Sequence, residues 1–571
     1  MGWPSRAPRQ PARAARTAYN RPMHDTARSD AASLRDDADV LIVGGGHNGL
    51  VCAAYLAAAG LGVTVLERRD VVGGAAVTEE FHPGFRNSTA SYTVSLLDPA
   101  VIAELRLATH GLRVVERPYS NFLPLPDGRA FRLGGPDGQA SIAAWSRRDA
   151  ERMAGYDAML GRVVVVLREL ARRTPPDPGG RMSIADWLAS YDIAKRLRGL
   201  DLRGRRDLLD LFTKSAGELL DHWFESEPLK AALGWDSVVG NFASPYTPGS
   251  AYVLLHHVFG EVNGKAGAWG HAIGGMGAIS QAIAAECAAR GVRVHTGAAV
   301  ERVLVERGRA TGVALADGRE LRAATVVSNL NPKLLYTRLV EREHLDDDTA
   351  ERIARYRCGS GTFRMNVALS ELPGFIAAPG TRLQPHHQSG ILVGPSLQYF
   401  ETAYFDAKSR AHNPGWARAP IVELVISSTL DDSLAPPGQH VASLFCQHVN
   451  PELPDGGWDA HRDTVARLMI DTVDAVAPNF ARSVLGYRAL SPLDLEREFG
   501  LVGGDIFHGA LGLDQMFSAR PLLGQGRYRG ALPGLYLCGA GTHPGGGVTG
   551  LPGRNAAREI LRDLRRKPRP G

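Results

Sequence analysis

The first long apolar stretch of the chain lies at residues 41–66, which contain no charged side chain. It is long enough to cross a bilayer, but a glycine cluster and the polar residues His47 and Asn48 interrupt it. The pattern instead predicts a strand at 39–43, a glycine turn, an alanine-rich helix and a second strand at 63–66. No other stretch of the sequence predicts a transmembrane helix.

Farther along the chain, the spacing of apolar residues changes several times. Residues 119–133 predict a β-hairpin with an Asp-Gly turn, and residues 145–260 predict mostly helices. Residues 293–328 predict a β-meander. The chain ends in a predicted strand that begins at Leu535 and a helix from about Asn555 to Arg566.

Composition places the chain among large globular proteins. It has 571 residues, 44% of them hydrophobic and 22% charged, which excludes a long disordered chain. This length corresponds to several domains or to two large interleaved ones. The five cysteines contain no C-x-x-C pair, which argues against a disulfide framework, a cysteine-rich zinc site and a dithiol redox motif.

The net charge of +5 is concentrated at the start of the chain. Residues 1–24 contain five arginines and no acidic residue, so the remaining chain is balanced. A nucleic-acid-binding protein carries its basic surface on its folded part, and we therefore exclude nucleic acid as the main partner. Residues 1–37 are predicted to be a disordered tail, with a mitochondrial targeting segment or a start at Met23 as alternatives. The expected compartment is the cytoplasm of a bacterium or the mitochondrial matrix of a eukaryote.

The clearest chemical signal is the G-x-G-x-x-G motif directly after the first strand. Gly44 permits the tight turn, Gly46 lets a pyrophosphate approach the backbone, and Gly49 lets the helix lie close to the strand. The helix start presents free N–H groups and a favourable dipole to phosphate. Glu67 ends the next strand, where a carboxylate binds both ribose hydroxyls and repels a 2′-phosphate. The pattern therefore predicts a site for FAD or NAD.

Two further glycine-rich turns are expected to bring backbone close to the cofactor, one after Glu67 and one after the strand at 535. His47, inside the first turn, is expected either to contact the cofactor or to fill space between loops. The residues predicted to contact the cofactor in these turns are His47, Asn48, Arg68, Gly73, Gly74, Ala75, Gly539, Gly547 and Val548.

The run ERRDVVGGA after the first turn and the run LYLCGAGTHPGGGVTG near the end resemble motifs of the FAD-dependent family of phytoene desaturases, carotenoid isomerases and amine oxidases. The resemblance extends in blocks from about residue 38 to 560 and is specific at these two motifs. It implies FAD as the cofactor, and it implies that the backbone of Val300 contacts adenine.

The resemblance also implies an α/β Rossmann-like FAD-binding domain of the glutathione-reductase type, which is discontinuous, with an inserted α+β substrate domain. The FAD-binding segments are then expected at 38–110, 262–330 and 500–565. The substrate segments are expected at 111–261 and 331–499. No second complete G-x-G-x-x-G with a downstream acid is present, so oxygen or a quinone, and not NAD(P)H, is the expected redox partner of the flavin.

Flavin chemistry needs few obligatory side chains, because the cofactor itself accepts the hydride. The catalytic candidates are His508, Arg520 and His543. His508, with Asp505, is a candidate acid–base pair, Arg520 offers a fork for a phosphate or carboxylate, and His543 is a candidate for the flavin edge. For each of them the alternative is a structural role in its loop. Tyr92 is expected either beside the flavin ring or in the core.

The sequence thus predicts an FAD-dependent oxidoreductase that takes a hydride from an apolar or amphipathic small molecule, in the manner of a desaturase. Apolar stretches such as VVVVL at 163–167 favour such a substrate, and they are compatible with peripheral membrane contact. Two alternatives stay open: a flavin-dependent polyene isomerase without net redox change, and a non-catalytic flavoprotein that binds a partner. No metal site is predicted, and the sequence does not determine the oligomeric state.

Overall fold

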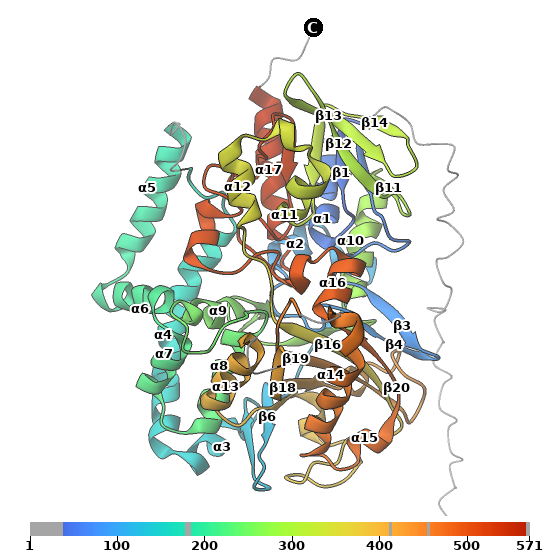
Figure 1. The fold of residues 1–571 in the computed structure, drawn as a ribbon. Coiled ribbons are helices and arrows are strands. Elements are labelled where there is room, and N and C mark those ends of the chain that lie inside the picture. Colours follow the sequence, from blue (N-terminus) through green and yellow to red (C-terminus); the bar gives the residue numbers. More distant parts are fainter. Residues whose placement is uncertain (1–37, 178–183, 410–413, 454–456, 567–571) are drawn as a thin grey trace, which may run out of the picture. The chain divides into compact units, whose positions relative to one another are not determined.

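The computed structural model describes residues 38–177, 184–409, 414–453 and 457–566. The predicted tail at 1–37 lies outside the described residues. The described part builds a parallel sheet and a larger, mainly antiparallel sheet, with helices packed on both (Figure 1).

The parallel sheet contains the two strands that flank the glycine motif. The run Val40–Val43 and the run Val63–Leu66 are buried on both faces, as is typical of strands inside a parallel sheet. In register, Val43 lies beside Leu66 and Ser328, so three strands end at the same level. The strand order is β11 (Arg293–His295), β2 (Val63–Leu66), β1 (Val40–Val43), β15 (Thr325–Ser328) and β21 (Leu535–Leu537).

Three helices pack together beside this sheet. They are α1 (His47–Ala58), α10 (Gly277–Ala289) and α17 (Leu551–Arg566), and α1 contacts both of the others. The last helix begins four residues before the predicted start at Asn555, because Pro552 lies in its first turn, where proline costs no hydrogen bond.

The predicted meander at 293–328 is correct only in its middle. Three antiparallel strands form it: β12 (Val300–Glu306), β13 (Arg309–Leu315) and β14 (Glu320–Arg322). The flanking runs at 293–295 and 325–328 join the parallel sheet instead. Short apolar runs do not show by themselves which sheet they enter.

The larger sheet contains the predicted hairpin at its edge. β6 (Asn121–Pro124) and β7 (Ala130–Leu133) pair antiparallel, as the Asp-Gly turn predicts. The other strands are β20 (Val484–Leu490), β16 (Thr362–Leu369), β19 (His440–Val449), β18 (Trp416–Val425) and β17 (Gly390–Val393), in that order toward β6. Helices α13 (Leu397–Lys408) and α14 (Gly457–Asp474) pack against β18.

A layer of helices occupies most of residues 138–257, as predicted. They are α3 (Gly138–Trp145), α4 (Arg147–Ala171), α5 (Ile184–Gly199), α6 (Leu202–Thr213), α7 (Ala216–Trp223), α8 (Glu227–Val238) and α9 (Ser250–His257). The VVVVL run lies in α4, where Val163, Val164 and Leu167 pack into the helical core. This run therefore packs the core and carries no information about the substrate.

Each of the two sheets takes its strands from one of the two predicted sets of segments. All strands of the parallel sheet come from 38–110, 262–330 and 500–565, whereas all strands of the larger sheet come from 111–261 and 331–499. The domain boundaries themselves stay a prediction, because residues 37–571 form one compact unit by their contacts. Within the described residues, no helix is both long and apolar enough to cross a membrane.

Buried Arg364 on β16 ties the larger sheet to the flavin-side segment at 88–94. Its guanidinium donates to the carbonyl oxygens of Ala90 at 3.0 Å and Leu444 at 2.7 Å. It lies 4.6 Å from the ring centroid of Tyr92, whose hydroxyl donates to Glu423. Burial lowers the pKa of Arg364 to about 10.

We expect Arg364→Met to lower the free energy of unfolding by about 3 kcal/mol, because it leaves the buried carbonyl oxygens of Ala90 and Leu444 without their donor. Urea unfolding measures the loss. The matched control is Arg482→Met, since that side chain is 75% exposed and lies 3.9 Å from Glu371, so it should change stability by less than about 0.5 kcal/mol. Equal effects of the two substitutions would contradict the role of Arg364.

Candidate functional site

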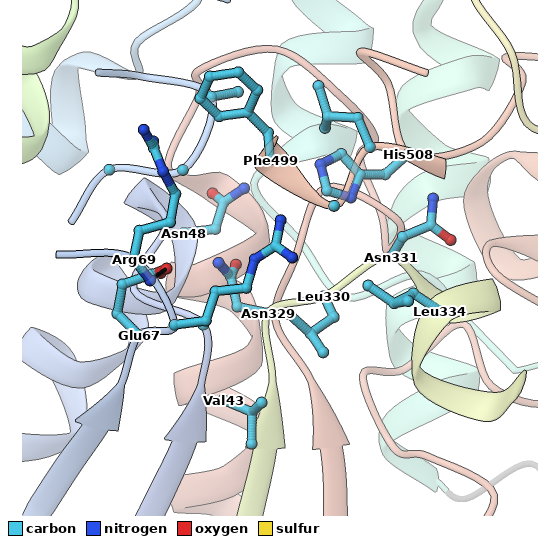
Figure 2. Close-up of a pocket in the computed structure, with 18 of the residues that line it drawn as sticks. Val43, Asn48, Glu67, Arg69, Asn329, Leu330, Asn331, Leu334, Phe499 and His508 are labelled. Atoms are coloured by element: carbon cyan, nitrogen blue, oxygen red, sulfur yellow. Dashed lines mark hydrogen bonds between the residues drawn. The ribbon is translucent and has the colours of Figure 1, made fainter. Parts of the chain in front are cut away.

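A cavity of about 240 Å³ opens where β1, β2 and β15 end. In an open parallel sheet, this is the edge at which ligands bind. Figure 2 shows Glu67 and Arg69 on one side of the cavity and Asn331 and His508 on the other. The cavity is therefore lined by residues from the start, the middle and the end of the chain.

The glycine motif forms one wall of the cavity by close packing. Gly44 has a φ of +96°, a conformation that favours glycine. A Cβ atom at Gly49 would lie 2.4 Å from the Gly44 carbonyl oxygen, so only glycine lets α1 begin directly on the turn. A Cβ atom at Gly46 would lie 2.6 Å from the side-chain amide nitrogen of Asn329, so that side chain would have to move.

Glu67 connects the end of β2 with the turn. Its carboxylate accepts hydrogen bonds from the backbone N–H of Gly45 at 2.8 Å and of Arg69 at 2.9 Å. The residue is 6% exposed and lines the cavity. The acid is thus oriented by backbone at the position where ribose recognition needs it.

Four buried polar atoms of cavity-lining residues have no hydrogen-bond partner within the described part of the chain. They are His47 Nε2, Asn48 Oδ1, Arg69 Nη1 and His508 Nδ1. A buried polar atom without a partner is costly, so unsatisfied atoms around one cavity indicate a polar ligand. Together with the glycine turn, these atoms fit a dinucleotide.

Residues 498–501, which form the end of α16 (Pro492–Phe499) and the two residues after it, line the opposite wall of the cavity. Arg68 donates to the carbonyl oxygens of Arg497 at 2.8 Å and Glu498 at 2.7 Å, at the C-terminal end of α16. The Arg69 guanidinium lies 4.8 Å from the Phe499 ring centroid. The two arginines that follow Glu67 therefore hold this wall in place.

Three ion pairs extend this attachment to the larger sheet. Glu79 lies 2.5 Å from Arg69 and 3.4 Å from Arg488 of β20. Arg488 in turn pairs with Glu498. The cavity wall at 498–501 is thus attached to both sheets.

His508 is held as a neutral side chain at the edge of the cavity. Its backbone φ is +57°, in the left-handed region. Burial, with smaller contributions from Arg520 and His47, lowers the pKa of His508 to about 3. Burial likewise lowers the pKa of His47 to about 4. Near neutral pH, both imidazoles can hydrogen-bond but carry no charge.

Most of the predicted cofactor-contacting residues do meet at this cavity. Gly49 lies behind it, as described above, and the C-terminal turn contributes Ala540 in place of Gly539, Gly547 and Val548, none of which lines the cavity. The predicted residues that line it are Gly44, Gly46, His47, Asn48, Glu67, Arg68, Gly73, Gly74, Ala75 and Val300.

Arg520 does not reach the cavity, which corrects its proposed catalytic role. It is fully buried, and its guanidinium donates to the backbone carbonyl oxygens of Phe507, Gly509, Ala510, Gln515 and Ala540 at 2.6–3.4 Å. Its donors are already directed at carbonyl groups, so it holds the loop that carries His508 and binds no phosphate or carboxylate.

His543 is also absent from the cavity lining. One ring nitrogen lies 3.0 Å from the Leu170 carbonyl oxygen of α4, and the ring lies against Phe517. Burial lowers its pKa to about 4. Its contacts join the C-terminal turn to the helical layer, so the structural alternative describes it better than the catalytic one.

The contacts of Asp505 and Tyr92 also indicate structural roles. Asp505 accepts from the backbone N–H groups of Gly359 at 2.9 Å and Phe507 at 2.8 Å, so it shapes the loop before His508 instead of pairing with its ring. Tyr92 packs in the helical core and is bonded to Glu423.

Several cavity residues were not predicted from the sequence. Asn329 and Asn331 follow β15 in the run SNLNP, where polar residues after a buried strand were an available signal. Arg69 directly follows Arg68, and Leu330 lies within the same run SNLNP. The others belong to loops and helices far from these motifs, and no local pattern marks them. These are Ala298, Leu334, Leu339, Phe499 and Leu501.

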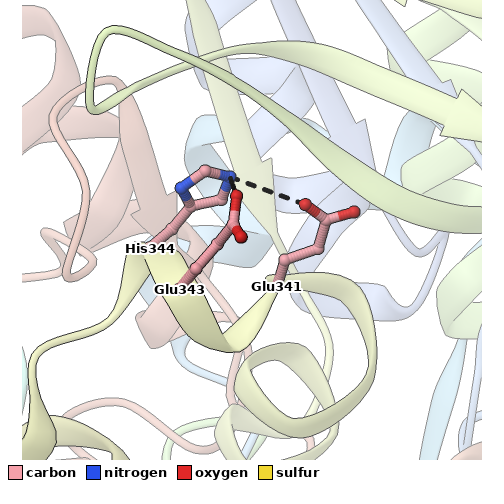
Figure 3. A group of neighbouring side chains, drawn as sticks. All are labelled: Glu341, Glu343 and His344. Carbon is pink, nitrogen blue, oxygen red and sulfur yellow. Dashed lines mark ion pairs between the residues drawn. The ribbon is translucent and has the colours of Figure 1, made fainter.

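One surface group has the residue types of a metal site. The ligand atoms of Glu341, Glu343 and His344 lie within 4.8 Å of one another (Figure 3). His344 Nε2 is 3.6 Å from Glu341 and 3.9 Å from Glu343, which are ion-pair distances, and both carboxylates are exposed. We assign no metal to this group, and the predicted lack of a metal site stays a prediction.

The family of the chain follows from its sequence together with this site. Residues 49–363, more than half of the chain, match the model of the flavin containing amine oxidoreductases. The chain belongs to this family. It is therefore an FAD-dependent oxidoreductase, with the Rossmann-like fold and substrate-side sheet that the motifs implied.

Relatives of this flavoprotein include proteins with different names. It is 42% identical over 560 residues to pyridine nucleotide-disulfide oxidoreductase domain-containing protein 2 of Rattus norvegicus, covering 93% of this chain and 94% of the relative. It is 26% identical to one of the subunits of limonene dehydrogenase from Castellaniella defragrans, covering 92% and 95%. It is also 26% identical to phytoene desaturase (lycopene-forming) of Paracoccus sp., covering 92% and 97%. The fold of putrescine oxidase matches with a TM-score of 0.55 at 14% identity, over 93% of this chain and 99% of that one.

The cysteines of this flavoprotein do not form the dithiol that one relative's name suggests. All five are free, and four of them are buried. Cys52 and Cys538 are hydrogen-bonded neighbours, and burial, followed by Cys52, raises the pKa of Cys538. A thiol needs its thiolate to react, so these buried thiols are poor redox groups.

We expect Gly46→Val to abolish FAD binding. The new side chain would occupy the space in front of Asn329, where the pyrophosphate approaches the backbone. Flavin absorbance per mole of purified protein measures the loss. The control is Gly161→Ala, because no atom lies within 4 Å of that added Cβ and alanine favours the α4 helix. Full flavin loading of a folded Gly46→Val protein would show that the turn is structural only.

We expect His508→Asn to make the apoprotein less sensitive to acid, and asparagine tolerates the left-handed backbone. Unfolded histidine takes up a proton below its ordinary pKa of 6.5, whereas folded His508 does so only near pH 3. Stability is therefore complete above pH 6.5 and falls as the pH decreases toward 3. The substitution should reduce the slope of unfolding free energy against pH by up to about 1.4 kcal/mol per pH unit. Urea unfolding across this range tests it, with exposed His222→Asn as the control.

Proposed function

We propose that this flavoprotein oxidises an uncharged, apolar or amphipathic small molecule by removing a hydride from carbon, in the manner of a desaturase. The printed names of two relatives support this proposal most directly, and the cofactor cavity is compatible with it: among the described residues, every ionisable side chain lining it is either paired or neutral. These side chains are His47, Glu67, Arg68, Arg69, Glu498 and His508.

The pairing leaves no charged group free for a substrate. Glu67 is bonded to backbone amides, and Arg68 to the carbonyl oxygens at the end of α16. Arg69 pairs with Glu79, and Glu498 pairs with Arg488. A cationic amine needs an anionic or aromatic partner, and a free carboxylate that would bind one is absent from this lining. The arrangement suits a substrate without charge.

The chain's own residues orient the reactants and keep water out. When bound, FAD accepts the hydride, so the protein need not supply a charged catalyst. His508 is neutral, so it serves as a hydrogen-bond partner at the cavity edge rather than as an acid at neutral pH. Leu330, Leu334 and Leu501 give the same cavity apolar walls.

The names of two relatives support the same substrate class, since limonene and phytoene are both hydrocarbons. Because the sequence contains a single complete dinucleotide motif, we propose that oxygen or a quinone reoxidises the flavin and that NADH and NADPH do not reduce it.

The test is anaerobic bleaching of the flavin in the purified holoprotein, with the flavin-free Gly46→Val protein as the blank. The panel contains limonene, phytoene in detergent and long-chain acyl compounds, together with putrescine, NADH and NADPH. We expect at least one uncharged apolar compound to bleach the flavin, and neither putrescine nor the nicotinamides to do so. Air or a soluble quinone should then restore the absorbance.

Three results would overturn the proposal. Bleaching by putrescine would indicate an amine oxidase, and fast bleaching by NADH or NADPH would indicate a pyridine-nucleotide enzyme. Conversion of a polyene by pre-reduced enzyme without consumption of electrons would indicate the isomerase. A flavin that no member of the panel bleaches would favour a non-catalytic role.

A further inference from the structure

Exposed large hydrophobic side chains cluster on one part of the helical layer. Of the twelve such side chains in the described residues, four lie on α5 and α6: Trp187, Tyr191, Leu202 and Leu209. Trp187 is 66% exposed and Tyr191 61%, although tryptophan and tyrosine are rarely so exposed without a partner. The cluster lies on α5 and α6, at the left of Figure 1.

The exposed aromatic residues of α5 share one face with basic residues. Trp187, Tyr191, Lys195 and Arg198 are spaced by four, four and three residues, which places them along one side of the helix. All four are exposed. This face therefore combines two amphipathic rings with two cations.

The following helix repeats this combination. On α6, Leu202, Arg205, Arg206 and Leu209 lie on one side and are all exposed, with Leu202 62% and Leu209 61% accessible. Arg205 donates to the carbonyl oxygen of Arg198 at 2.8 Å, which ties the end of α5 to α6. The two faces are thus joined at the corner between the helices.

Charge is also concentrated here. Residues 193–209 contain six basic and two acidic residues, a net charge of +4, whereas the chain after its first 24 residues is balanced. One of the two acids, Asp207, is already paired with Arg162 at 2.6 Å. The folded part thus has a local positive surface although its total charge is close to zero.

We propose that the outer face of α5 and α6, defined by Trp187, Tyr191, Lys195, Arg198, Leu202 and Leu209, docks this protein onto an anionic bilayer surface. Tryptophan and tyrosine favour the interface between headgroups and acyl chains, and adjacent Lys and Arg side chains extend to anionic headgroups. Positive charge beside exposed aromatic rings matches such a surface, whereas a protein partner's hydrophobic core interface is depleted of lysine. The proposal does not depend on the substrate class proposed above.

Packing contacts connect the docking face to the surroundings of the cofactor cavity. α6 packs on α4 and α9. The α4 residue Leu170 accepts from His543 of the C-terminal turn, and His256 of α9 lies 5.5 Å, ring to ring, from Phe507 beside His508. These contacts connect the docking face, through α4 and α9, to the loops around the cofactor cavity.

Sedimentation with vesicles tests the proposal on the full-length holoprotein. The vesicles consist of phosphatidylcholine alone or with about one third phosphatidylglycerol. We expect binding to the anionic vesicles only, and loss of most of it in about 0.5 M salt, where charges are screened within a few ångströms. K195E/R198E should weaken binding by about 20-fold or more, and W187S/Y191S by about 10-fold.

Two matched variants separate this face from other sources of binding. F405S/K408E removes an exposed aromatic ring and a cation from α13, and it should leave vesicle binding unchanged. In the second variant, glutamine replaces the five arginines of residues 1–24, namely Arg6, Arg9, Arg13, Arg16 and Arg21. It should retain at least half of the binding. Flavin content and melting temperature show that each variant is folded.

Several outcomes would overturn the proposal. These are equal binding to neutral vesicles, no binding to either kind, loss of binding in the tail variant alone, and equal losses in the α13 and α5 variants. If K195E/R198E and W187S/Y191S instead change the oligomeric state in solution without lipid, the face is an interface between copies of this chain.

Discussion

The level at which three parallel strands end determines where this protein can hold its cofactor. Val43, Leu66 and Ser328 lie side by side in register, so the residues that follow them meet at one edge of the sheet. Glu67 then reaches back to the Gly45 amide, and Asn329 reaches the space in front of Gly46. A shift of one residue in any of these strands would reverse its side chains and separate these groups.

Beyond the ends of the strands, arginine side chains hold the loops that line the cavity. Arg520 gathers five carbonyl oxygens and so gives the loop at 507–515 its shape, which places His508 at the cavity. Arg68 and Arg69 hold the wall at 498–501, and Arg364 holds the larger sheet against the flavin side. A guanidinium has five donors in a rigid fork, so one buried arginine can organise several carbonyl groups that a loop leaves without strand partners.

This division explains what the sequence alone could predict. The glycine motif, Glu67 and the strands around them depend mainly on contacts within about 30 residues of chain. The spacing of such residues is enough to predict the site that they form. The contacts of Arg520 and His543 favour the structural alternative over the catalytic one, because closeness to a motif in sequence does not show which way a side chain points. Phe499 and Leu501 reach the cavity only through long-range packing, so no local pattern marks them. The early start of α17 was missed because Pro552 and Gly553 look like helix breakers, although proline is tolerated in a first turn.

The distribution of charge links the cavity to the outside of the molecule. Around the cofactor, each ionisable side chain of the lining is bonded to backbone, paired with an opposite charge or kept neutral by burial. These side chains are thus occupied by the protein itself. Apolar compounds, the substrate class that we propose, dissolve poorly in water and collect in membranes. An enzyme with this cavity therefore gains more from a surface that reaches the bilayer than from electrostatic attraction of substrates in solution. The aromatic and basic face of α5 and α6 is the part of the described structure that best fits this need.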